Sequence, residues 1–452
     1  MSQYIRKLLI IGVIIVSSQG LTAKNWYIDA EQGLDSNTGN SPKKAWQTLT
    51  NANTIVLGPG DSLLLKSGTT YDGQLKPKGS GSITALVYIG CYGQSGHLSS
   101  PRINAGGQYK AALFLYNNAC ITVAGLECTN TATSRISGQS GVLVEAENSG
   151  TLPSITLRDL FIHDVNGSLV KKQGGGQGIQ IVNGGKDIKS RFDHLLIENC
   201  HICRTERNGI IFNSDYWNRK DWFPNLHVVI RGNLLEKVPG DGIVPLGCEG
   251  ALVEHNHMWD CTRLLPDTEA AAGIWPWSCD HTVIQYNEVS DHKAPWDAQG
   301  FDCDYNCVGT IIQYNYSHNN EGGFLLVCSP SGQRMPFSIG NDSSVVRYNL
   351  SVNDGVRTSG IHAGFSPAML ITGPVTNTDI HHNTVIVYQK PAGCDPDLIK
   401  MDTWGGDWPL KTTFTHNTFY VKDSASIDLG KDKQTIFKDN LFIGNISNQP
   451  IP

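Results

Sequence analysis

One short phrase recurs through the second half of the chain and constrains its fold more than any other feature. The phrase is an apolar residue followed within three positions by Asn, after which polar and apolar residues alternate. The Asn residues are Asn199, Asn233, Asn256, Asn287, Asn315, Asn349, Asn383, Asn417 and Asn440. The steps between them are 34, 23, 31, 28, 34, 34, 34 and 23 residues. A motif that returns at such intervals predicts a solenoid in which each repeat is one structural unit.

The repeats carry the signature of β-strands. They are rich in Val, Ile, Thr and Tyr, alternate with a period of two, and lack the period of an amphipathic helix. Because Asn tolerates the left-handed backbone region, we expect the repeated Asn residues to occupy that conformation at a corner of each coil. Stacked coil on coil, their side-chain amides are expected to form a hydrogen-bonded ladder.

A second phrase, Gly followed by an apolar residue, comes after each Asn in the middle of the chain. It begins at Gly209, Gly242, Gly273, Gly300, Gly323 and Gly360. Two strand phrases per coil, joined by turns of variable length, resemble the right-handed parallel β-helix of the pectin-lyase-like superfamily. The resemblance implies an all-β, right-handed parallel β-helix over most of the chain.

The N-terminal part resembles the opening of secreted bacterial β-helix hydrolases and lyases. The resemblance rests on Trp26-Tyr27-Ile28-Asp29-Ala30, Trp46-x-x-Leu49 and Pro59-Gly60-Asp61. It implies an N-terminal cap, since the open end of a solenoid needs a polar cover, and we expect a short helix over 44–54. We therefore predict one domain, with the cap and first coils over 24–110 and the β-helix over 111–452.

The first residues are typical of an export signal. Arg6 and Lys7 precede the apolar run Leu8 to Val16, and small residues follow up to Ala23. The run is too short to span a bilayer, so we predict a signal peptide over 1–23 and a secreted or periplasmic protein. The alternative is a buried N-terminal strand. No later segment has the length of a membrane span.

Composition excludes nucleic acid as a partner. Lys and Arg number 35 against 41 Asp and Glu, which gives 35 − 41 = −6, and there is no basic excess for phosphate contacts. Charged residues make up only 17%, whereas Gly reaches 48 of 452 residues, as many tight turns require. The sequence leaves the oligomeric state open.

Four cysteines recur at a similar distance after the Gly phrase. Cys248, Cys279, Cys307 and Cys328 lie five to seven residues after the Gly of their own repeats. We expect them to stack at one corner at about the 4.8 Å spacing of adjacent strands. That spacing suits both disulfides and a column of buried free thiols, and the sequence leaves both open.

Strand alternation predicts a row of carboxylates on the outer face. If the residue after each Gly points inward, Asp302 and Asp304 point outward, about 7 Å apart along one strand. Glu321 precedes the strand of the next coil, and Asp241 and Asp297 come from neighbouring turns. Carboxyl groups so close to one another are expected to raise at least one pKa. A protonated carboxyl beside a carboxylate is what glycosidic cleavage requires, so we predict Asp302, Asp304 and Glu321 as catalytic residues.

Other side chains of the same region are candidate substrate contacts. Trp275 and Trp277 would be exposed on the preceding coil, where they could stack on sugar rings or lie beneath a covering loop. His292, Lys293, Arg357 and His362 could bind a uronate or assist proton transfer, and Asp241 and Asp297 complete this set.

Two other interpretations of the acidic cluster remain. It could be solvated surface, or Asp297, Asp302, Asp304 and Glu321 could bind Ca²⁺, because clustered carboxylates are hard oxygen ligands. Apart from this calcium, no cofactor is expected.

The segment 297–302 resembles a degraded form of the polygalacturonase signature Asn-Thr-Asp-Gly-x-Asp. Gln299 replaces the middle Asp, and Leu325-Leu326-Val327-Cys328 stands where that family has Asp-Asp-Cys, so its catalytic roles are not carried over. The run 300–324 is more similar to β-helix proteins of bacterial glycan-degrading systems, some of whose relatives are glycoside hydrolases.

From these observations we predict a secreted glycoside hydrolase acting on a plant or algal cell-wall polysaccharide or its oligosaccharides. The alternatives are a calcium-dependent polysaccharide lyase acting on a uronic-acid glycan, with Lys293 as base, and a non-catalytic glycan-binding β-helix.

Overall fold

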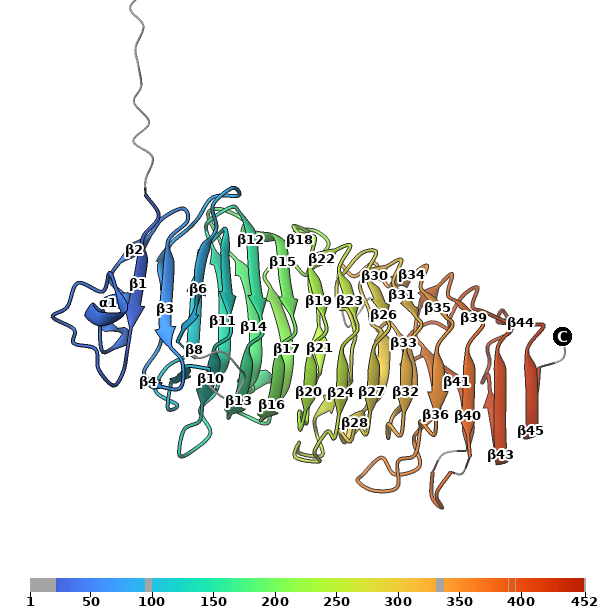
Figure 1. The fold of residues 1–452 in the computed structure, drawn as a ribbon. Coiled ribbons are helices and arrows are strands. Elements are labelled where there is room, and N and C mark those ends of the chain that lie inside the picture. Colours follow the sequence, from blue (N-terminus) through green and yellow to red (C-terminus); the bar gives the residue numbers. More distant parts are fainter. Residues whose placement is uncertain (1–21, 94–99, 331–336, 389, 395, 451–452) are drawn as a thin grey trace, which may run out of the picture.

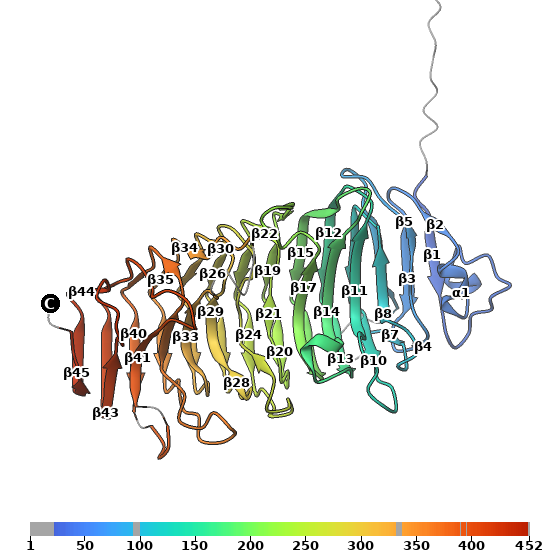
Figure 2. The ribbon, with the colours of Figure 1, turned by 180° about the vertical axis from the view of Figure 1, so that it is seen from behind.

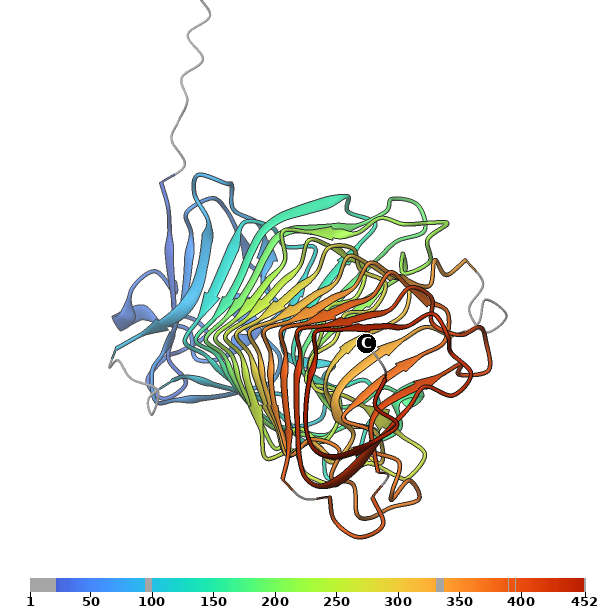
Figure 3. The same cartoon turned by 90° about the vertical axis from the view of Figure 1, so that its right-hand side faces the viewer.

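A computed structural model describes residues 22–93, 100–330, 337–388, 390–394 and 396–450. Short strands pair in parallel, coil upon coil, along a single axis that runs from the N-terminal cap to the C-terminus (Figure 1). The same coils are visible from behind in Figure 2. Seen along the axis, each coil is a closed loop of strands and turns (Figure 3). The predicted parallel β-solenoid is therefore present.

Three parallel sheets make up the coils. The first contains β1 (Asn25–Ile28), β3 (Ser62–Lys66), β6 (Val87–Tyr92), β9 (Ile121–Ala124), β12 (Thr151–Arg158), β15 (Arg191–Glu198), β19 (Val229–Arg231), β23 (Leu252–Glu254), β26 (Val283–Gln285), β31 (Ile311–Gln313), β35 (Val345–Arg347), β39 (Asp379–His381), β42 (Thr413–Thr415) and β44 (Ile436–Lys438), with β18 (Asn225–Leu226) and β22 (Cys248–Glu249) alongside. The second contains β4 (Thr70–Asp72), β7 (Arg102–Asn104), β10 (Glu127–Asn130), β13 (Phe161–Val165), β16 (His201–Thr205), β20 (Leu234–Glu236), β24 (His257–Trp259), β27 (Glu288–Ser290), β32 (Tyr316–His318), β36 (Leu350–Val352), β40 (Thr384–Val387), β43 (Thr418–Asp428) and β45 (Leu441–Ser447).

The third sheet carries the Gly phrases. It begins with β8 (Ala111–Tyr116), β11 (Ser140–Glu147), β14 (Gln177–Gly184), β17 (Asn208–Ser214) and β21 (Ile243–Val244). Single bridges through Ile274 continue it to β29 (Gln299–Cys303), β33 (Gly323–Cys328), β37 (Met369–Thr372) and β41 (Asp397–Asp402). The remaining short strands are β2 (Val56–Leu57), β5 (Lys78–Gly79), β25 (Ala270–Ala271), β28 (Trp296–Asp297), β30 (Cys307–Val308), β34 (Asn341–Asp342) and β38 (Val375–Thr376).

The core is a stack of aligned apolar side chains. In the first sheet, Ile197 pairs in register with Ile230, and the row continues through Val253 and Ile284 to Phe437. Every member of this row is buried. Since burying one such side chain stabilises the folded state by about 1.5–3 kcal/mol, continuous rows of this kind favour one strand register.

The predicted Asn ladder is present from Asn233 to Asn440. Each side-chain amide donates to the Oδ1 of the next Asn at 2.9–3.0 Å, as Asn287 does to Asn315, and each backbone N–H donates to the same oxygen. The left-handed conformation, however, belongs to the residue before each Asn, such as Tyr286 with φ 55°. Our assignment of that conformation to the ladder residues was therefore wrong.

Asn199 is not a member of the ladder. It has φ 54° and occupies the left-handed corner, while Cys200 takes the ladder position and donates its N–H to Asn233 Oδ1 at 2.9 Å. The repeat phrase here is one residue shorter than in the other coils, which shifted our alignment.

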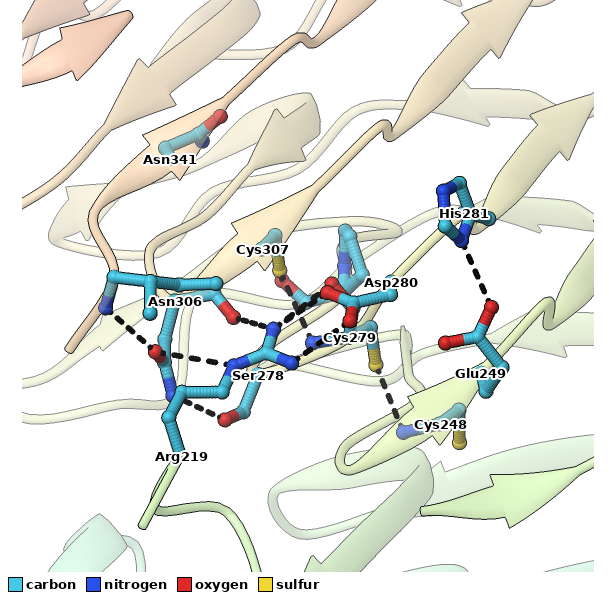
Figure 4. Close-up of polar contacts among 12 residues, drawn as sticks. Arg219, Cys248, Glu249, Ser278, Cys279, Asp280, His281, Asn306, Cys307 and Asn341 are labelled. Atoms are coloured by element: carbon cyan, nitrogen blue, oxygen red, sulfur yellow. Dashed lines mark hydrogen bonds and ion pairs between the residues drawn. The ribbon is translucent and has the colours of Figure 1, made fainter. Parts of the chain in front are cut away.

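The cysteine column is real, but its membership differs from the prediction. The N–H of Cys248 donates to the Sγ of Cys279, and the N–H of Cys279 donates to the Sγ of Cys307 (Figure 4). All three are free thiols, and Asn225 and Asn341 pair with the two ends of the column. Cys328 lies elsewhere, on the outer face of β33.

Two of the six Gly phrases were aligned wrongly. Gly323 pairs with Gln299 rather than Gly300, so Leu325 and Val327 enter the core while Leu326 and Cys328 face outward. The phrase at Gly360 lies in a turn, and the strand of that coil is β37, which pairs with β33. Local sequence resembles the repeat in both places, but register follows the burial of the apolar row.

The N-terminal end contains the helix α1 (Leu49–Ala52) within the predicted range 44–54, after the 3₁₀ turn η1 (Pro42–Lys44). Another 3₁₀ turn, η3 (Lys171–Gln173), lies between β13 and β14. No helix in the described part of the chain is long and apolar enough to cross a bilayer. The predicted signal peptide falls almost wholly outside the described residues, and export stays a prediction.

Candidate active site

Four aspartates meet on the outer face of the third sheet. Asp302 lies on β29 and Asp304 directly follows it, while Asp297 ends β28 and Asp241 precedes β21. The charge of Asp297 raises the pKa of both Asp302 and Asp304, and the charge of Asp241 raises the pKa of Asp297 and Asp302. The structure therefore brings together the two strand aspartates and the two turn aspartates that the sequence singled out.

Asp302 and Asp304 face outward as predicted but are covered rather than exposed. Their side chains lie beside Leu326 and Cys328 of β33, and only 4% and 9% of the two residues is accessible. Burial, together with the charges of Asp297, Asp304 and Asp241, raises the pKa of Asp302 well above its usual range. Its Oδ1 is buried and accepts no hydrogen bond.

Asp304 has defined hydrogen-bond partners. Its Oδ1 accepts from the N–H of Tyr305 at 2.7 Å and from the thiol of Cys328 at 3.0 Å. Burial nevertheless raises its pKa to about 7, because these two bonds offset only part of the desolvation. Asp304 can therefore exchange a proton near neutral pH.

Asp297 lies at the edge of the cluster and is half-buried. Burial and the charge of Asp241 raise its pKa to about 6, against the lowering effect of Lys171 and Arg357. Both Asp297 and Ala298 have left-handed backbones, with φ 58° and 62°, which non-Gly residues rarely adopt. A Cβ on Gly322 would lie 1.5 Å from the carbonyl oxygen of Asp297, so glycine is required there for the next coil to pass.

Arg357 binds the backbone of the turn that contains Asp297. Its guanidinium is 1% exposed and donates to the carbonyl oxygens of Ala294, Pro295 and Asp297. Our prediction that Arg357 binds a uronate or assists proton transfer was wrong, because its Nη1 and Nη2 donate to backbone carbonyls and the residue is closed to solvent. A buried guanidinium bound to three carbonyls fixes the path of the chain that presents Asp297.

Lys171 supplies the positive charge of the cluster. Its Nζ lies 3.0 Å from Asp241 Oδ2 and 4.9 Å from the ring of Trp275. Burial alone would raise the pKa of Asp241. The charges of Lys171 and Arg207 outweigh this effect, so the pKa of this carboxyl lies below its usual value. Glu269 holds the loop in place by accepting from the N–H of Lys171 at 2.7 Å.

A pocket of about 350 Å³ opens beside the carboxyls. Its walls include the aromatic rings of Trp296, Phe365 and Trp404, and its acidic groups are Asp297 and Asp402. Leu326, the neighbour of Asp302 on the next strand, also lines it. Aromatic walls with a few convergent polar groups are typical of small-ligand pockets and provide flat faces for sugar rings.

The tryptophan pair is less exposed than predicted. Trp275 is 8% exposed, beneath the Lys171 loop, and its Nε1 donates to Asp241 Oδ1 at 3.3 Å. Trp277 is half-buried, stacks on Trp217 with a centroid distance of 5.8 Å, and meets Tyr305 edge to face. Tyr305 in turn contacts Trp404 at the pocket. The alternative of a covering loop is therefore confirmed for Trp275, while Trp277 belongs to an aromatic row that leads to the pocket.

The loop that carries Trp217 is anchored by Arg219. Its guanidinium pairs with Asp280 at 2.7 Å and donates to the carbonyl oxygen of Asn306, as Figure 4 shows. Asp280 and Asn306 are the sequence neighbours of Cys279 and Cys307 in the cysteine column. The contacts of Arg219 therefore tie the loop to these coils and hold Trp217 against Trp277.

The other predicted residues lie outside the coupled carboxyls. Glu321 is ion-paired with Arg263. His292 is fully buried, its Nε2 lies 2.9 Å from the carbonyl oxygen of Gly240, and burial lowers its pKa to about 4, so its role as a substrate contact was wrong. Lys293 is half-buried. His362 packs against Trp296 at the pocket wall.

The four predicted calcium ligands do not converge on one point. Among the described residues, only two groups of three or more His, Cys, Asp or Glu side chains bring their ligand atoms within 4.8 Å of one another, and neither includes these carboxylates. Glu321 is ion-paired with Arg263, and Asp304 accepts a hydrogen bond from the thiol of Cys328. These two carboxylates are therefore engaged with other groups, whereas Ca²⁺ requires several oxygen ligands directed at one point. The residues therefore do not fit calcium.

Sequence reasoning missed Lys171, Trp217, Phe365 and Trp404. All four lie in turns between strands, outside the repeat phrases on which the prediction rested. A cue was nevertheless present, because the coils that carry these turns are longer than the shortest coils of the chain.

Comparisons with known proteins support the β-helix fold seen in the structure. The family described as a right handed beta helix region matches residues 177–342. The crystal structure of a GH136 lacto-N-biosidase from Eubacterium ramulus superposes with a TM-score of 0.70 and 25% identity, covering 88% of this chain and 68% of that one. The chain is a right-handed parallel β-helix. An alginate lyase with 13% identity and a TM-score of 0.55 shares the fold, with 88% of this chain and 82% of that one covered.

Two curated proteins are similar in sequence. A lacto-N-biosidase of Bifidobacterium longum subsp. longum is 30% identical over 75% of this chain, and an alpha-1,3-galactosidase A of Akkermansia muciniphila is 36% identical over 14% of it. The chain spans about a quarter of the length of the first relative (26%) and 11% of the second. Both relatives are named as enzymes that act on glycosides.

Proposed function

We propose that the protein is a glycoside hydrolase whose reacting groups are Asp297 and Asp304, with Asp302 beside them. The observation that carries the proposal is the set of coupled carboxyls with raised pKa values next to an aromatic-walled pocket. Similarity to a lacto-N-biosidase in sequence and in structure supports the same reaction class.

The pKa values suggest a division of roles. Asp297, with a pKa of about 6, is mostly ionised at pH 7 and lines the pocket, as the nucleophile or base of a glycosidase requires. Asp304, with a pKa of about 7, is still protonated in a large fraction of molecules and can protonate the leaving oxygen. Burial and the neighbouring carboxylates raise the pKa of Asp302 well above its usual range, which favours its neutral form, and a neutral carboxyl can donate to a sugar hydroxyl or to a neighbouring carboxylate.

The substrate is proposed to be an oligosaccharide rather than a long cell-wall polymer. The walls of Trp296, Phe365 and Trp404 surround a compact pocket, and Lys171, the cation of the cluster, is already paired with Asp241. The carboxylates of a polyuronate would therefore compete with Asp241 for the charge of Lys171. A glycan that carries a lacto-N-biosyl unit is the first substrate to test, since both similar lacto-N-biosidases carry that name.

The test is hydrolysis of such an oligosaccharide, measured as released sugar, with Asp297→Asn and Asp304→Asn beside the unchanged protein. We expect each substitution to reduce kcat by more than a hundredfold, because general acid–base catalysis alone contributes about 10²–10⁴-fold. The matched control is Asp342→Asn, since that carboxylate binds Thr376 and Asn377 on the β34 side of the coil. Full activity in both site variants, or an unsaturated, ultraviolet-absorbing product from a uronate polymer, would contradict the proposal.

A further inference from the structure

A second cluster of functional side chains lies away from the carboxyls, at a corner of the first sheet. Asp193 and His194 belong to β15, and His227 precedes β19 in the next coil. The Nδ1 atoms of both histidines point at one oxygen, Asp193 Oδ1, at 2.8 Å for His194 and 2.7 Å for His227. The two rings stack with centroids 4.4 Å apart.

The backbone explains why these side chains meet. His194 and His227 have φ of 62° and 50°, the left-handed conformation that the aligned residues also adopt in the coils from Cys120 to Lys411. Residues in this conformation project outward one above the other on successive coils, and Asp193, one position earlier, reaches both. The contact therefore joins two coils through their side chains as well as through the strand ladder.

The donor set is one that binds divalent transition metals. Two imidazole nitrogens and one carboxylate oxygen suit Zn²⁺, and their ligand atoms all lie within 4.8 Å of one another. In a tetrahedral site with bonds of about 2.0–2.1 Å, neighbouring ligand atoms are about 3.3 Å apart. The observed 2.7–2.8 Å contacts would need to open by roughly half an ångström.

The surroundings allow that movement. The side chains of His194 and His227 are 67% and 63% exposed, and that of Asp193 is 27% exposed. No core packing restrains the imidazoles, and water can complete the coordination sphere from the solvent side. We propose that Asp193, His194 and His227 bind a zinc-like divalent cation that bridges two adjacent coils.

The same corner provides a matched control two coils later. His281 has φ 52° and binds one carboxylate, Glu249 Oε1, at 2.8 Å (Figure 4). Its side chain is 66% exposed, like those of His194 and His227, but no second imidazole faces it, because Gly250 and Gly309 occupy the adjacent corner positions. An imidazole–carboxylate pair of the same exposure is thus present without the third ligand.

The experiment is calorimetric titration of the metal-free protein, without a polyhistidine tag, with ZnCl₂. His194→Gln and His227→Gln are expected to weaken Zn²⁺ binding at this site by about tenfold or more, as loss of metal-site groups does, while His281→Gln leaves it unchanged. Zn²⁺ should also raise the Tm of the unchanged protein and of His281→Gln, but not of His194→Gln, because the metal binds only the folded site. CaCl₂ should produce neither effect, since imidazole is a poor ligand for this hard cation.

The contrary outcomes are equally specific. Absence of Zn²⁺ binding, equal weakening by His281→Gln, or full binding in both corner variants would overturn the proposal. The other described group of three potential ligands, His201, Cys203 and Glu236, supplies one more discriminating variant. If His201→Gln abolishes binding and His194→Gln does not, the metal belongs to that group and the corner site is refuted.

Discussion

Replacing Asn315 by Ala tests how much the amide ladder contributes to the stability of the β-helix. Asn315 is 2% exposed. Its Nδ2 donates to Asn349 Oδ1 and to the carbonyl oxygen of Ile284, each at 3.0 Å, and its Oδ1 accepts the N–H and the amide of Asn287 at 2.9 and 3.0 Å. Alanine would deprive two buried backbone groups, the N–H of Asn287 and the carbonyl of Ile284, of these partners.

An unsatisfied buried polar group costs about 1–3 kcal/mol. The two stranded groups therefore predict a loss of about 2–6 kcal/mol in the free energy of unfolding for Asn315→Ala. Asn440→Ala removes the same kinds of bond, to Asn417 and to the carbonyl of Phe414, but at the half-exposed end of the ladder, where water can replace them. We expect about 1 kcal/mol or less there.

The assay is urea unfolding followed by far-ultraviolet circular dichroism, with comparison of the slopes because solenoids can unfold in stages. Hydrogen exchange at the Asn287 amide adds a local measurement, and that amide should lose protection in Asn315→Ala alone. Equal destabilisation by the two substitutions, or less than 1 kcal/mol for Asn315→Ala, would refute the argument that the ladder is a cooperative buried network.

Three further predictions concern single side chains. Arg357→Met should lower kcat by about tenfold or more with a small change in KM, since the turn that presents Asp297 loses its three carbonyl contacts. Trp217→Ala should raise KM more than it lowers kcat, because Trp217 contributes a ring to the row that leads to the pocket. Asp354→Asn should stabilise the protein at pH 7.5 by up to about 3 kcal/mol, because burial raises the pKa of Asp354 to about 6, about two above the unfolded value. The raised pKa means that the destabilisation is complete above pH 6 and absent below about pH 4, where the carboxyl is protonated in both states.

Each of these has its own check. For Arg357→Met, the Tm should fall as well, because three carbonyl oxygens lose their donor, so kcat is measured well below the Tm of the variant. A normal kcat in the folded variant would contradict the positioning role. A Trp217→Ala variant with unchanged KM for a long oligosaccharide would remove the aromatic row from the binding surface. Thermal unfolding of Asp354→Asn at pH 7.5 and at pH 4 measures the last prediction, which fails if the Tm gain is the same at both values.

The repeat phrase was sufficient to predict the solenoid, its ladder and the outward direction of Asp302 and Asp304. These follow from periodicity, because the same apolar row must be buried in every coil. Register failed at Gly323 and Gly360, where a Gly followed by an apolar residue occurs without being the start of the aligned strand.

The environment of the carboxyls could not be predicted in the same way. Whether Asp302 is exposed depends on its neighbours on β33 and on turns far away in the sequence, and neither follows from local alternation. The role of Arg357 could not be predicted either, since only the folded chain shows that its side chain meets carbonyl oxygens of residues 60 to 63 positions earlier in the sequence.

The spacing of the Asn ladder also measures how many residues each coil has in its turns. The shortest steps, Asn233 to Asn256 and Asn417 to Asn440, need 23 residues to close a coil, so a step of 34 carries 34 − 23 = 11 additional residues. Because every ladder position makes the same bonds to the next, those additional residues can change without disturbing the stack. A β-helix of this kind can therefore acquire a new substrate when the additional turn residues of one coil are replaced. The coils on either side keep their register.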